Sequence, residues 1–290
     1  MDLILQSPHL GTPALTAFAS ALPATQLRQR DGAAWLAGIA HAPDLAATVA
    51  ALAQAWHCDA ALFTALPSAR DFRALVMDMD STVITIECID ELARLAGRGA
   101  AVAAITEAAM RGEITDYAQS LRQRVQLLQA APATVIEQVQ EQSLRYSPGA
   151  TALLAAARGY GWSSLLVSGG FSVFAQDVAR TLGFDASCAN TLVVREGVIT
   201  GEVLGPAENG GAIVDGASKA RALQRLCAAL GCSTREAIVV GDGANDLPMM
   251  ALAGLSVAYH AKPRVRASAR VALDYGGLDG ILMLLRESWA

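Results

Sequence analysis

Residues 75–85 read Leu-Val-Met-Asp-Met-Asp-Ser-Thr-Val-Ile-Thr, and this stretch is the strongest indication of the fold. The apolar run from Leu75 to Met77 is typical of a buried parallel strand. It is followed by Asp78 and Asp80, and open α/β sheets bind their ligands at the carboxyl ends of their strands. Two acids spaced by two residues on an extended chain point the same way. Their mutual repulsion therefore calls for a metal ion, or for one acid that works protonated.

The composition narrows the class of protein and its surroundings. The chain has 290 residues, of which 53% are hydrophobic and 17% charged. A net charge of −5 and scattered basic residues disfavour a nucleic-acid partner. The sequence has no uncharged apolar run of about 18 residues that would indicate a membrane span, and its N-terminus lacks the pattern of a secretory signal. The five cysteines form no CxxC pair, which favours the reducing cytoplasm.

Strand and helix patterns alternate over residues 71–290, which predicts an α/β fold with a Rossmann-like doubly wound parallel sheet. The candidate strands are Ala74–Met77, Ser164–Val167, Ala237–Val240 and Ser256–Tyr259. Residues 86–146 interrupt the alternation with apolar residues at helical spacing, so we expect a helical cap inserted after the first strand. Residues 190–204 predict a hairpin that turns at Glu196-Gly197.

Residues 1–70 have the pattern of a separate, small α+β domain. The order of their predicted elements is βαββαβ, which is the ferredoxin-like arrangement. The strands are expected at Leu3–Gln6, Gln26–Arg30, Ala34–Ile39 and Cys58–Thr64, and the helices at Pro13–Leu22 and Asp44–Trp56. The Asp31-Gly32 dipeptide favours a tight turn between the second and third strands. Modules of this kind bind small molecules or mediate pairing, so a homodimer through this domain and binding of a regulatory amino acid both stay open.

Three more groups of residues are expected near the two aspartates. Ser168 and Gly169 follow a candidate strand, where glycine allows backbone N–H groups to converge on an anion. Lys219 lies at the start of a predicted helix, and Asp242 follows another candidate strand and offers a hard oxygen ligand for Mg²⁺. Taken alone, the segments around Ser168 and Asp242 could be ordinary turns, and Lys219 could be a solvated surface residue. Together they predict transfer of a phosphoryl group to a carboxylate, assisted by a divalent metal.

These motifs resemble those of the haloacid dehalogenase-like phosphohydrolases, and within them the phosphoserine phosphatase family. The four shared motifs are Asp78-Met79-Asp80-Ser81-Thr82, Ser168-Gly169, Lys219 and Gly241-Asp242-Gly243-Ala244-Asn245-Asp246. The resemblance continues through Thr85–Ala93, Met110–Ile114 and Gln119–Val125. Residues 1–70 resemble the ACT-like regulatory domains that precede this catalytic domain in some bacterial members.

The resemblance implies separate roles for the two aspartates. Asp78 would be the nucleophile that forms an aspartyl-phosphate, with Mg²⁺ and Lys219 keeping its pKa low. Asp80 would protonate the leaving oxygen and then activate water, while its backbone carbonyl contacts the metal. Asp242 would complete the metal site. Asp246 would orient that site or serve as a helix cap, and both readings stay open.

The same resemblance assigns the residues that hold the phosphate. Ser168, the N–H of Gly169 and Lys219 would bind it and balance the charge that develops during transfer. Asn245 would contact the phosphate or the serine.

Substrate choice is expected to depend on the cap. Glu87 would meet the ammonium of phosphoserine, and Arg124 would meet its carboxylate in a two-pronged contact. Arg122 competes with Arg124, although a two-residue step directs it to another part of the helix. Met110 corresponds to an apolar position above the substrate. Tyr117 stands where the family usually has phenylalanine, in a stretch that is longer by one residue.

The resemblance implies a cytoplasmic enzyme that hydrolyses O-phospho-L-serine to L-serine and phosphate with Mg²⁺, the last step of serine biosynthesis. A related phosphatase for homoserine phosphate or phosphothreonine is the alternative, because the Glu87–Arg124 pair suits any phospho-amino acid. A signalling receiver also phosphorylates an aspartate at a strand end, but Asp80 and the helical insertion argue against it. A non-catalytic serine sensor conflicts with the full set of catalytic positions. The expected partner is a small phospho-amino acid, without nucleic acid or membrane.

Overall fold

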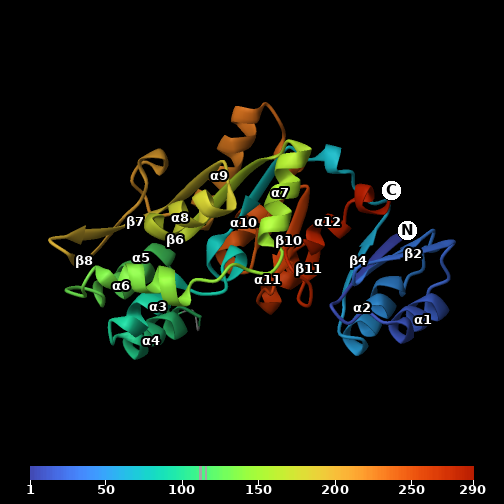
Figure 1. The fold of residues 1–290 in the computed structure, drawn as a ribbon, viewed down its shortest axis with the longest axis horizontal. Coiled ribbons are helices and arrows are strands. Elements are labelled where there is room, and N and C mark those ends of the chain that lie inside the picture. The colour runs from blue at the N-terminus through green and yellow to red at the C-terminus, as the bar shows by residue number, and fades with distance from the viewer. Residues whose placement is uncertain (111–112, 115) are drawn as a thin grey trace.

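The computed structural model describes residues 1–110, 113–114 and 116–290, and these form two β-sheets (Figure 1). A four-stranded sheet lies at the N-terminal end of the chain, drawn in blue, and a seven-stranded sheet forms the larger part. The green helices extend from the larger part on the side away from the N-terminal sheet. The chain thus has a small α+β part followed by a larger α/β part, which confirms the predicted fold class.

The N-terminal sheet has the strand order β2-β3-β1-β4, and its neighbouring strands are antiparallel. Its elements are β1 (Asp2–Gln6), α1 (Thr12–Ala21), β2 (Gln26–Arg30), β3 (Ala33–Ala37), α2 (Leu45–Ala55) and β4 (Asp59–Phe63). Alternation along β1 directs Leu3 and Leu5 toward α1 and α2, and Ile4 toward the larger part. The predicted turn is present, with φ of 40° at Asp31 and 75° at Gly32. The ferredoxin-like pattern is therefore confirmed.

The larger sheet has the strand order β11-β10-β9-β5-β6-β7-β8. Its strands are β5 (Ala74–Met77), β6 (Ser163–Phe171), β7 (Ala186–Arg195), β8 (Val198–Leu204), β9 (Ala237–Gly241), β10 (Leu255–Tyr259) and β11 (Val271–Leu273). They pair in parallel, except that β7 and β8 are antiparallel. The predicted strands are present, but β6 runs on through the expected turn to Phe171, with a shifted register after Val167.

Helices cover both faces of this sheet, as a doubly wound fold requires. They are α7 (Ala150–Tyr160), α8 (Ser172–Leu182), α9 (Gly216–Leu230), α10 (Leu247–Met250), α11 (Pro263–Ser268) and α12 (Gly280–Met283). Leu75 and Met77 of β5 share one core with α7 and α8. Ala74 and Val76 share a second core with α9 and α10. Burial on both faces explains why β5 is a continuous apolar run.

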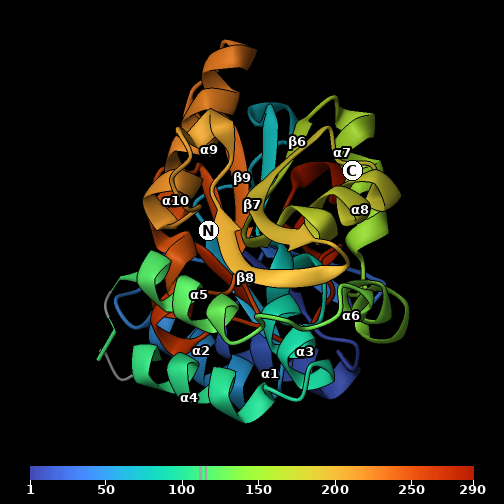
Figure 2. The ribbon, with the colours of Figure 1, turned by 90° about the vertical axis from the view of Figure 1, so that its left-hand side faces the viewer.

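A helical insertion follows β5 and contains α3 (Cys88–Leu95), α4 (Gly99–Met110), α5 (Tyr117–Gln126) and α6 (Thr134–Gln138). The chain leaves and re-enters the core through two paired segments. The N–H of Thr85 donates to the carbonyl of Arg145 at 2.9 Å. The N–H of Ser147 donates to the carbonyl of Val83 at 2.9 Å. We call these two segments, Val83 to Thr85 and Arg145 to Ser147, the neck of the cap. Figure 2 shows the cap helices beside β8.

The hairpin of β7 and β8 gives the cap a second attachment. Its turn is the predicted one, with φ of 50° at Glu196 and 77° at Gly197. The N–H of Ala130 in the cap donates to the carbonyl of Ile199 at 2.9 Å, and the N–H of Ile199 donates back to Ala131 at 2.9 Å. The cap is therefore held both at its neck and at the hairpin.

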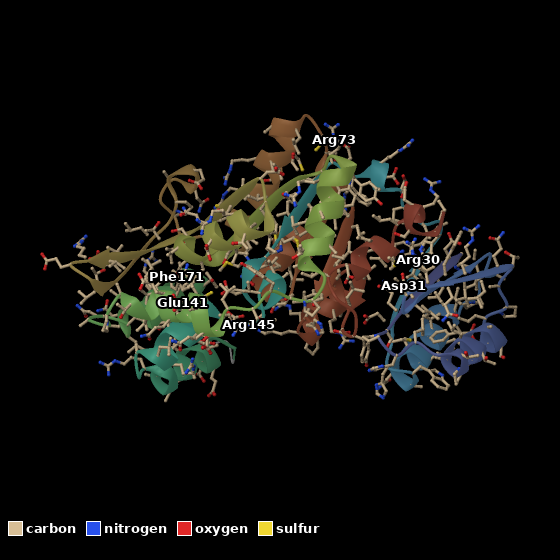
Figure 3. The ribbon with its side chains drawn as sticks, in the orientation of Figure 1. Arg30, Asp31, Arg73, Glu141, Arg145 and Phe171 are labelled. Atoms are coloured by element: carbon tan, nitrogen blue, oxygen red, sulfur yellow. The ribbon has the colours of Figure 1, made fainter. Side chains whose placement is uncertain are left out.

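The N-terminal sheet packs against the C-terminal end of the chain. The ring centroids of Trp35 and Trp289 are 6.2 Å apart, and Arg30 donates to the carbonyl of Ser288 at 3.0 Å. Figure 3 shows Arg30 and Asp31 on the side of the N-terminal sheet that faces the larger part. None of the helices in the described ranges combines the length and the apolar character that crossing a membrane requires.

Candidate active site

The candidate residues gather at the carboxyl edge of the larger sheet. β5 lies between β6 and β9, and all three strands are parallel. Met77, the last residue of β5, pairs with Leu166 of β6 and Val240 of β9. The N–H of Asp78 donates to the carbonyl of Val240 at 3.0 Å, which fixes Asp78 beside the turn that contains Asp242. Three motifs that are far apart in the sequence therefore meet at one edge.

Lys219 is a fully buried cation that links two acids. Its Nζ lies 2.7 Å from Oδ1 of Asp78 and 2.7 Å from Oδ1 of Asp246, and none of its side chain is exposed. The other oxygen of Asp246 accepts the N–H of Gly243 at 3.0 Å. A buried charge needs such partners, because an unpaired one costs several kcal/mol of desolvation. The contact of Asp246 with the Gly243 N–H is one half of a capping box at the short helix Ala244–Asp246, which agrees with the helix-cap interpretation, and its other oxygen holds Lys219.

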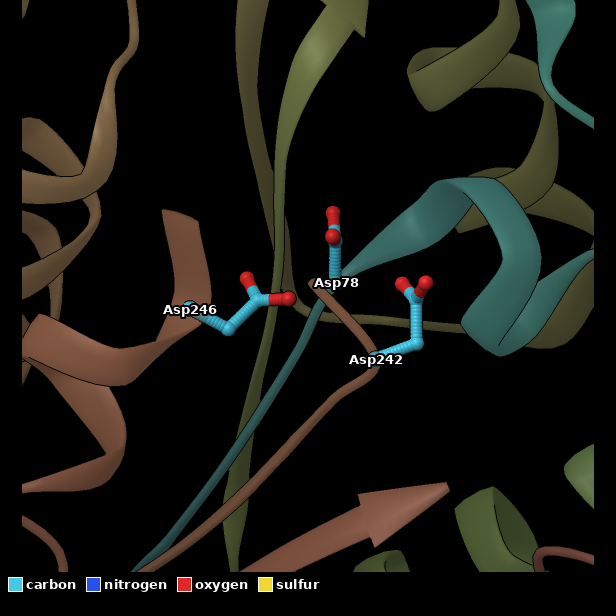
Figure 4. A group of neighbouring side chains, drawn as sticks. All are labelled: Asp78, Asp242 and Asp246. Atoms are coloured by element: carbon cyan, nitrogen blue, oxygen red, sulfur yellow. The ribbon is translucent and has the colours of Figure 1, made fainter. Parts of the chain in front are cut away.

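The acids of this edge form a cluster that suits a cation. Asp78, Asp242 and Asp246 each offer an oxygen, and these oxygens lie within 4.8 Å of one another (Figure 4). Both oxygens of Asp246 are already engaged, whereas Oδ1 of Asp242 accepts only the Thr82 hydroxyl, at 3.3 Å. Among the described residues, the second oxygens of Asp78 and Asp242 accept no hydrogen bond. Free carboxylate oxygens in a partly buried site are the donors that Mg²⁺ prefers.

The pKa values of these acids support the same reading. Burial, and after it the charge of Asp246, raise the pKa of Asp78 well above its usual range, although Lys219 opposes this. Burial and Asp246 also raise the pKa of Asp242 to about 6. Lys219 lowers the pKa of Asp78, in the direction expected from the sequence, but burial and the charge of Asp246 outweigh it. A divalent cation at the cluster would supply the missing positive charge, so the residues present fit a metal ion.

Asp80 takes different partners from Asp78. The chain turns between Met79 and Val83, where Ser81 adopts a left-handed φ of 55°, so the two acids are not neighbours on an extended strand. Oδ1 of Asp80 accepts the N–H of Cys88 at 2.8 Å, and Oδ2 accepts the Ser168 hydroxyl at 3.0 Å. Its carboxyl therefore lies outside the acidic cluster formed by Asp78, Asp242 and Asp246.

The glycines after Ser168 allow two close approaches. A Cβ on Gly169 would lie 2.1 Å from the hydroxyl oxygen of Tyr117, and one on Gly170 would lie 2.7 Å from Oδ2 of Asp80. The Gly170 N–H donates to the Ser168 oxygen at 2.8 Å, so this buried hydroxyl both donates and accepts. Any side chain at either glycine would displace the residues that surround the candidate phosphate site.

Asn190 supports the glycine-containing end of β6, a role that the sequence did not predict. Its side-chain N–H₂ donates to the Gly169 carbonyl at 2.8 Å, and its side-chain oxygen accepts the N–H of Val214 at 2.8 Å. Asn190 is fully buried in β7. An amide inside a strand was the signal that could have identified it, because a buried amide must find partners.

The cap brings further predicted residues to the site. Glu87 directly precedes α3 and is exposed to solvent, and its carboxylate accepts the Ser81 hydroxyl at 2.7 Å. Partial burial and the charge of Asp80 raise the pKa of Glu87 to about 7. Tyr117 begins α5 over Gly169, and burial raises the pKa of its phenol while the charges of Lys219 and Arg124 lower it. The cap therefore places an acid and a phenol near the core acids.

The other residues predicted from the sequence lie on α5, on α4 and in the turn after β9. Arg124 is half-buried on α5, with its Nε 3.4 Å from the Ser120 carbonyl, whereas Arg122 is exposed. This difference favours Arg124 as the residue nearer the site. Asn245 lies in the turn after β9, where a Cβ on Gly243 would meet its side-chain oxygen at 2.3 Å. Met110 ends α4, and its side chain lies outside the described residues.

Comparison with known proteins identifies the family. The model of the haloacid dehalogenase-like hydrolase family matches residues 75–251. A phosphoserine phosphatase of Polaromonas sp. (strain JS666) is 52% identical over 216 residues, which are 74% of this chain and 91% of that protein. One of Albidiferax ferrireducens is 51% identical over 216 residues, 74% of this chain and 90% of that protein.

A solved structure extends the similarity to nearly the whole chain. The crystal structure of a probable phosphoserine phosphatase from Vibrio cholerae superimposes with a TM-score of 0.82 at 35% sequence identity. The match covers 98% of this chain and 86% of that chain, so it includes the N-terminal sheet. The matched family model, the relatives and this fold agree with the motifs gathered at the sheet edge. The chain therefore belongs to the haloacid dehalogenase-like hydrolase family, among its phosphoserine phosphatases.

Proposed function

We propose that this chain is a Mg²⁺-dependent phosphatase that hydrolyses O-phospho-L-serine to L-serine and phosphate, the last step of serine biosynthesis. The single observation that carries the proposal is the buried Asp78–Lys219–Asp246 array beside Asp242, at the edge where ligands of α/β sheets bind. The names of the two bacterial relatives support the choice of substrate.

In the first half of the reaction, an oxygen of Asp78 attacks the phosphorus and the bond to the serine oxygen breaks. Asp80 donates its proton to that oxygen, so serine leaves as a neutral alcohol. In the second half, the Asp80 carboxylate takes a proton from water as the water attacks the aspartyl-phosphate. Phosphate leaves and both acids return to their starting states. The contacts of Asp80 with Cys88 and Ser168, outside the acidic cluster, support its role as proton carrier.

Charge balance is the task that we assign to the surrounding core residues. Ser168, the Gly169 N–H, Lys219 and Asn245 would hold the phosphate, with Lys219 already 2.7 Å from the nucleophile. The carboxylates of Asp78 and Asp242 and the carbonyl of Asp80 would hold Mg²⁺. When bound, Mg²⁺ would neutralise charge on the phosphoryl oxygens and on Asp78. The unengaged oxygens of the acidic cluster support this assignment.

Recognition of the amino acid is assigned to the cap. Glu87 would bind the ammonium and Arg124 the carboxylate, and the half-buried position of Arg124 supports it over the exposed Arg122. Met110 and Tyr117 would close over the substrate. The Tyr117 hydroxyl lies directly against Gly169, and this close approach is possible only because glycine has no side chain.

The organisation of the chain is part of the proposal. We assign residues 1–70 to an ACT-like domain and residues 71–290 to the phosphatase domain, with its cap at about residues 86–146. A homodimer would form through the N-terminal domain. A cytoplasmic location is supported by five cysteines, which are all free thiols.

Phosphate release from a panel of phosphomonoesters tests the proposal. Phosphoserine should give the highest kcat/KM, EDTA should abolish the activity, and Mg²⁺ should restore it. Asp78→Asn should release no phosphate from any substrate. Arg124→Ala should raise KM for phosphoserine more than for p-nitrophenyl phosphate, which has no carboxylate. A higher kcat/KM for homoserine phosphate or phosphothreonine would reassign the substrate, and equal effects on both esters would remove the carboxylate role of Arg124.

A further inference from the structure

Asp59 fastens the N-terminal sheet to the larger part of the chain. It begins β4 and is 5% exposed. Its Oδ1 accepts the N–H of Asp274 at 2.6 Å, and its Oδ2 accepts those of Tyr275 at 3.1 Å and Gly276 at 3.0 Å. Hydrogen bonds to an ionised carboxylate are about twice as strong as neutral ones. One side chain therefore fixes three successive backbone groups of the loop that follows β11.

That loop runs directly to the chain beside the neck of the cap. The N–H of Leu278 donates to the carbonyl of Pro148 at 2.8 Å. A Cβ on Gly277 would lie 2.8 Å from the same carbonyl oxygen. A Cβ on Gly149, where φ is 78°, would lie 2.1 Å from Oδ1 of Asp279. The two segments are thus in close contact, with no space for a side chain at Gly149 or Gly277, and a shift of one must move the other.

Pro148 immediately follows the neck. Its neighbour Ser147 donates to Val83 on the outgoing segment, and Thr85 donates back to Arg145. The distance along the sequence from Asp59 to Asp274 is 215 residues, yet the connection in space needs only the loop 274–279. A continuous set of hydrogen bonds and close contacts therefore joins β4 of the N-terminal sheet to the segments on which the cap turns.

We propose that Asp59 is a positioning residue for the cap: through the loop 274–279, the N-terminal sheet braces the neck and favours one setting of the cap over the acids. The proposal rests on the proposed function only in taking the cap as the part that closes over substrate. The contact of Arg30 with Ser288 is at the C-terminal end of the chain instead, so it joins the two parts without involving the loop or the neck.

A looser neck lowers the fraction of molecules with a closed cap, and the apparent affinity for substrate falls by that fraction. Asp59→Asn keeps the size of the side chain but removes its charge and turns an N–H₂ group toward N–H donors. Gly277→Ala disturbs the contact between loop and neck from the other end and leaves the N-terminal sheet intact. Arg30→Gln is the matched control at the same interface.

Amide hydrogen exchange of the full chain, followed by NMR, tests the proposal without reference to turnover. Asp59→Asn should speed exchange at Thr85 and Ser147 by about tenfold, the change expected from losing one hydrogen bond to a charged group. Gly277→Ala, whose Cβ would meet the Pro148 carbonyl oxygen at 2.8 Å, should speed exchange at the same two amides. The Ala130 amide, at the hairpin attachment, should exchange at an unchanged rate in both variants. In Arg30→Gln all three amides should exchange as in the wild type.

Unchanged exchange at Thr85 and Ser147 in folded Asp59→Asn and Gly277→Ala would overturn the proposal, and so would equal acceleration in Arg30→Gln. Kinetics give an independent readout. KM for phosphoserine should rise several-fold in the first two variants, while kcat changes less. If the wild type does not hydrolyse phosphoserine, the proposed substrate fails, but the exchange result still decides whether Asp59 braces the neck.

Discussion

Lys219 sets the electrostatics of the site at the scale of single residues. Burial by itself lowers the pKa of its ammonium, but Asp246 and Asp78 raise that pKa above its usual value. The lysine is therefore charged, and its Nζ lies 2.7 Å from Asp78, the proposed nucleophile. The same contact explains why a lysine, normally a solvated residue, is fully buried on α9.

Replacing this cation should damage stability as well as activity. Lys219→Met should lower the free energy of unfolding by about 3 to 5 kcal/mol, because it leaves two buried acids without their partner. Urea denaturation at pH 8 measures the change, with the exposed Arg122→Met as the control. Equal unfolding midpoints for Lys219→Met and the wild type would show that the two acids do not depend on Lys219.

The titration of Glu87 should appear in substrate affinity. Its pKa of about 7 means that the carboxylate is largely protonated below neutral pH, so its attraction for the substrate ammonium is lost as the pH falls. KM for phosphoserine should therefore rise between pH 8 and pH 6. The same measurement on Glu87→Gln corrects for titration of the phosphate, and its KM should change less over this range. If KM changed with pH in the same way in the wild type and in Glu87→Gln, the ionised Glu87 carboxylate would not contribute to substrate binding.

At the scale of helices and strands, the sequence predicted those features that depend on neighbouring residues, such as strand bounds and tight turns. The strand from Ala74 to Met77 has the predicted bounds, and the Glu196-Gly197 turn lies where a positive φ is needed. Continuation of β6 to Phe171 was not predicted, because a Ser-Gly-Gly sequence is equally compatible with a turn. The role of Asn190 was also not predictable, since its partners come from distant segments brought together by the tertiary fold.

Asp215 is the N-cap residue of α9, the helix that carries Lys219, so it helps to fix the position of that lysine. The Asp215 carboxylate accepts two hydrogen bonds from Ser218, one from its backbone N–H at 2.8 Å and one from its hydroxyl at 2.7 Å. Asp215→Ala should lower the free energy of unfolding by about 1 kcal/mol and reduce kcat, whereas Asp215→Asn, also a good cap, should keep most of the stability. Denaturation and initial rates measure both. Full activity in a destabilised Asp215→Ala would show that Lys219 does not depend on this cap.

The ionisation of Asp215, the N-cap residue of α9, should make the free energy of unfolding depend on pH. Burial opposes ionisation of Asp215, but the hydrogen bonds from Ser218 and the charge of Arg221 lower its pKa below the usual value. An acid with a lowered pKa in the folded state stabilises the fold fully above its unfolded pKa of about 3.9. That contribution is lost as the pH falls further. The stability difference between wild type and Asp215→Ala should therefore shrink below about pH 4, and a constant difference would contradict it.

On the scale of the whole molecule, the sequence predicted two parts and their separate topologies, but not how they pack. Asp59 reads as an ordinary residue at a strand start, and only the fold brings it to the backbone of residues 274–276. The acidic cluster is likewise a property of the assembled sheet. Its acids come from two strand ends and a turn, and the raised pKa values of Asp78 and Asp242 arise only once these residues are buried beside Asp246.

Metal binding should stabilise the entire fold. Mg²⁺ at a hundred times its dissociation constant would add about 2.7 kcal/mol to the free energy of unfolding, because it binds only the folded cluster. For a protein of this size the Tm should rise by several degrees, and EDTA should reverse the rise. Thermal unfolding of Asp242→Asn should show little response to Mg²⁺. A similar rise in that variant would place the metal elsewhere.

In the proposed reaction, phosphoserine transfers its phosphoryl group to Asp78. Rapid acid quenching within a single turnover, followed by peptide mass spectrometry, tests it most directly. With Mg²⁺ present, the peptide that contains residues 74–84 should bear one phosphoryl group on Asp78 during turnover, and the group should be absent with EDTA and in Asp78→Asn. Release of phosphate from phosphoserine at the normal rate, with no phosphoryl group on Asp78 at any quench time, would contradict the account.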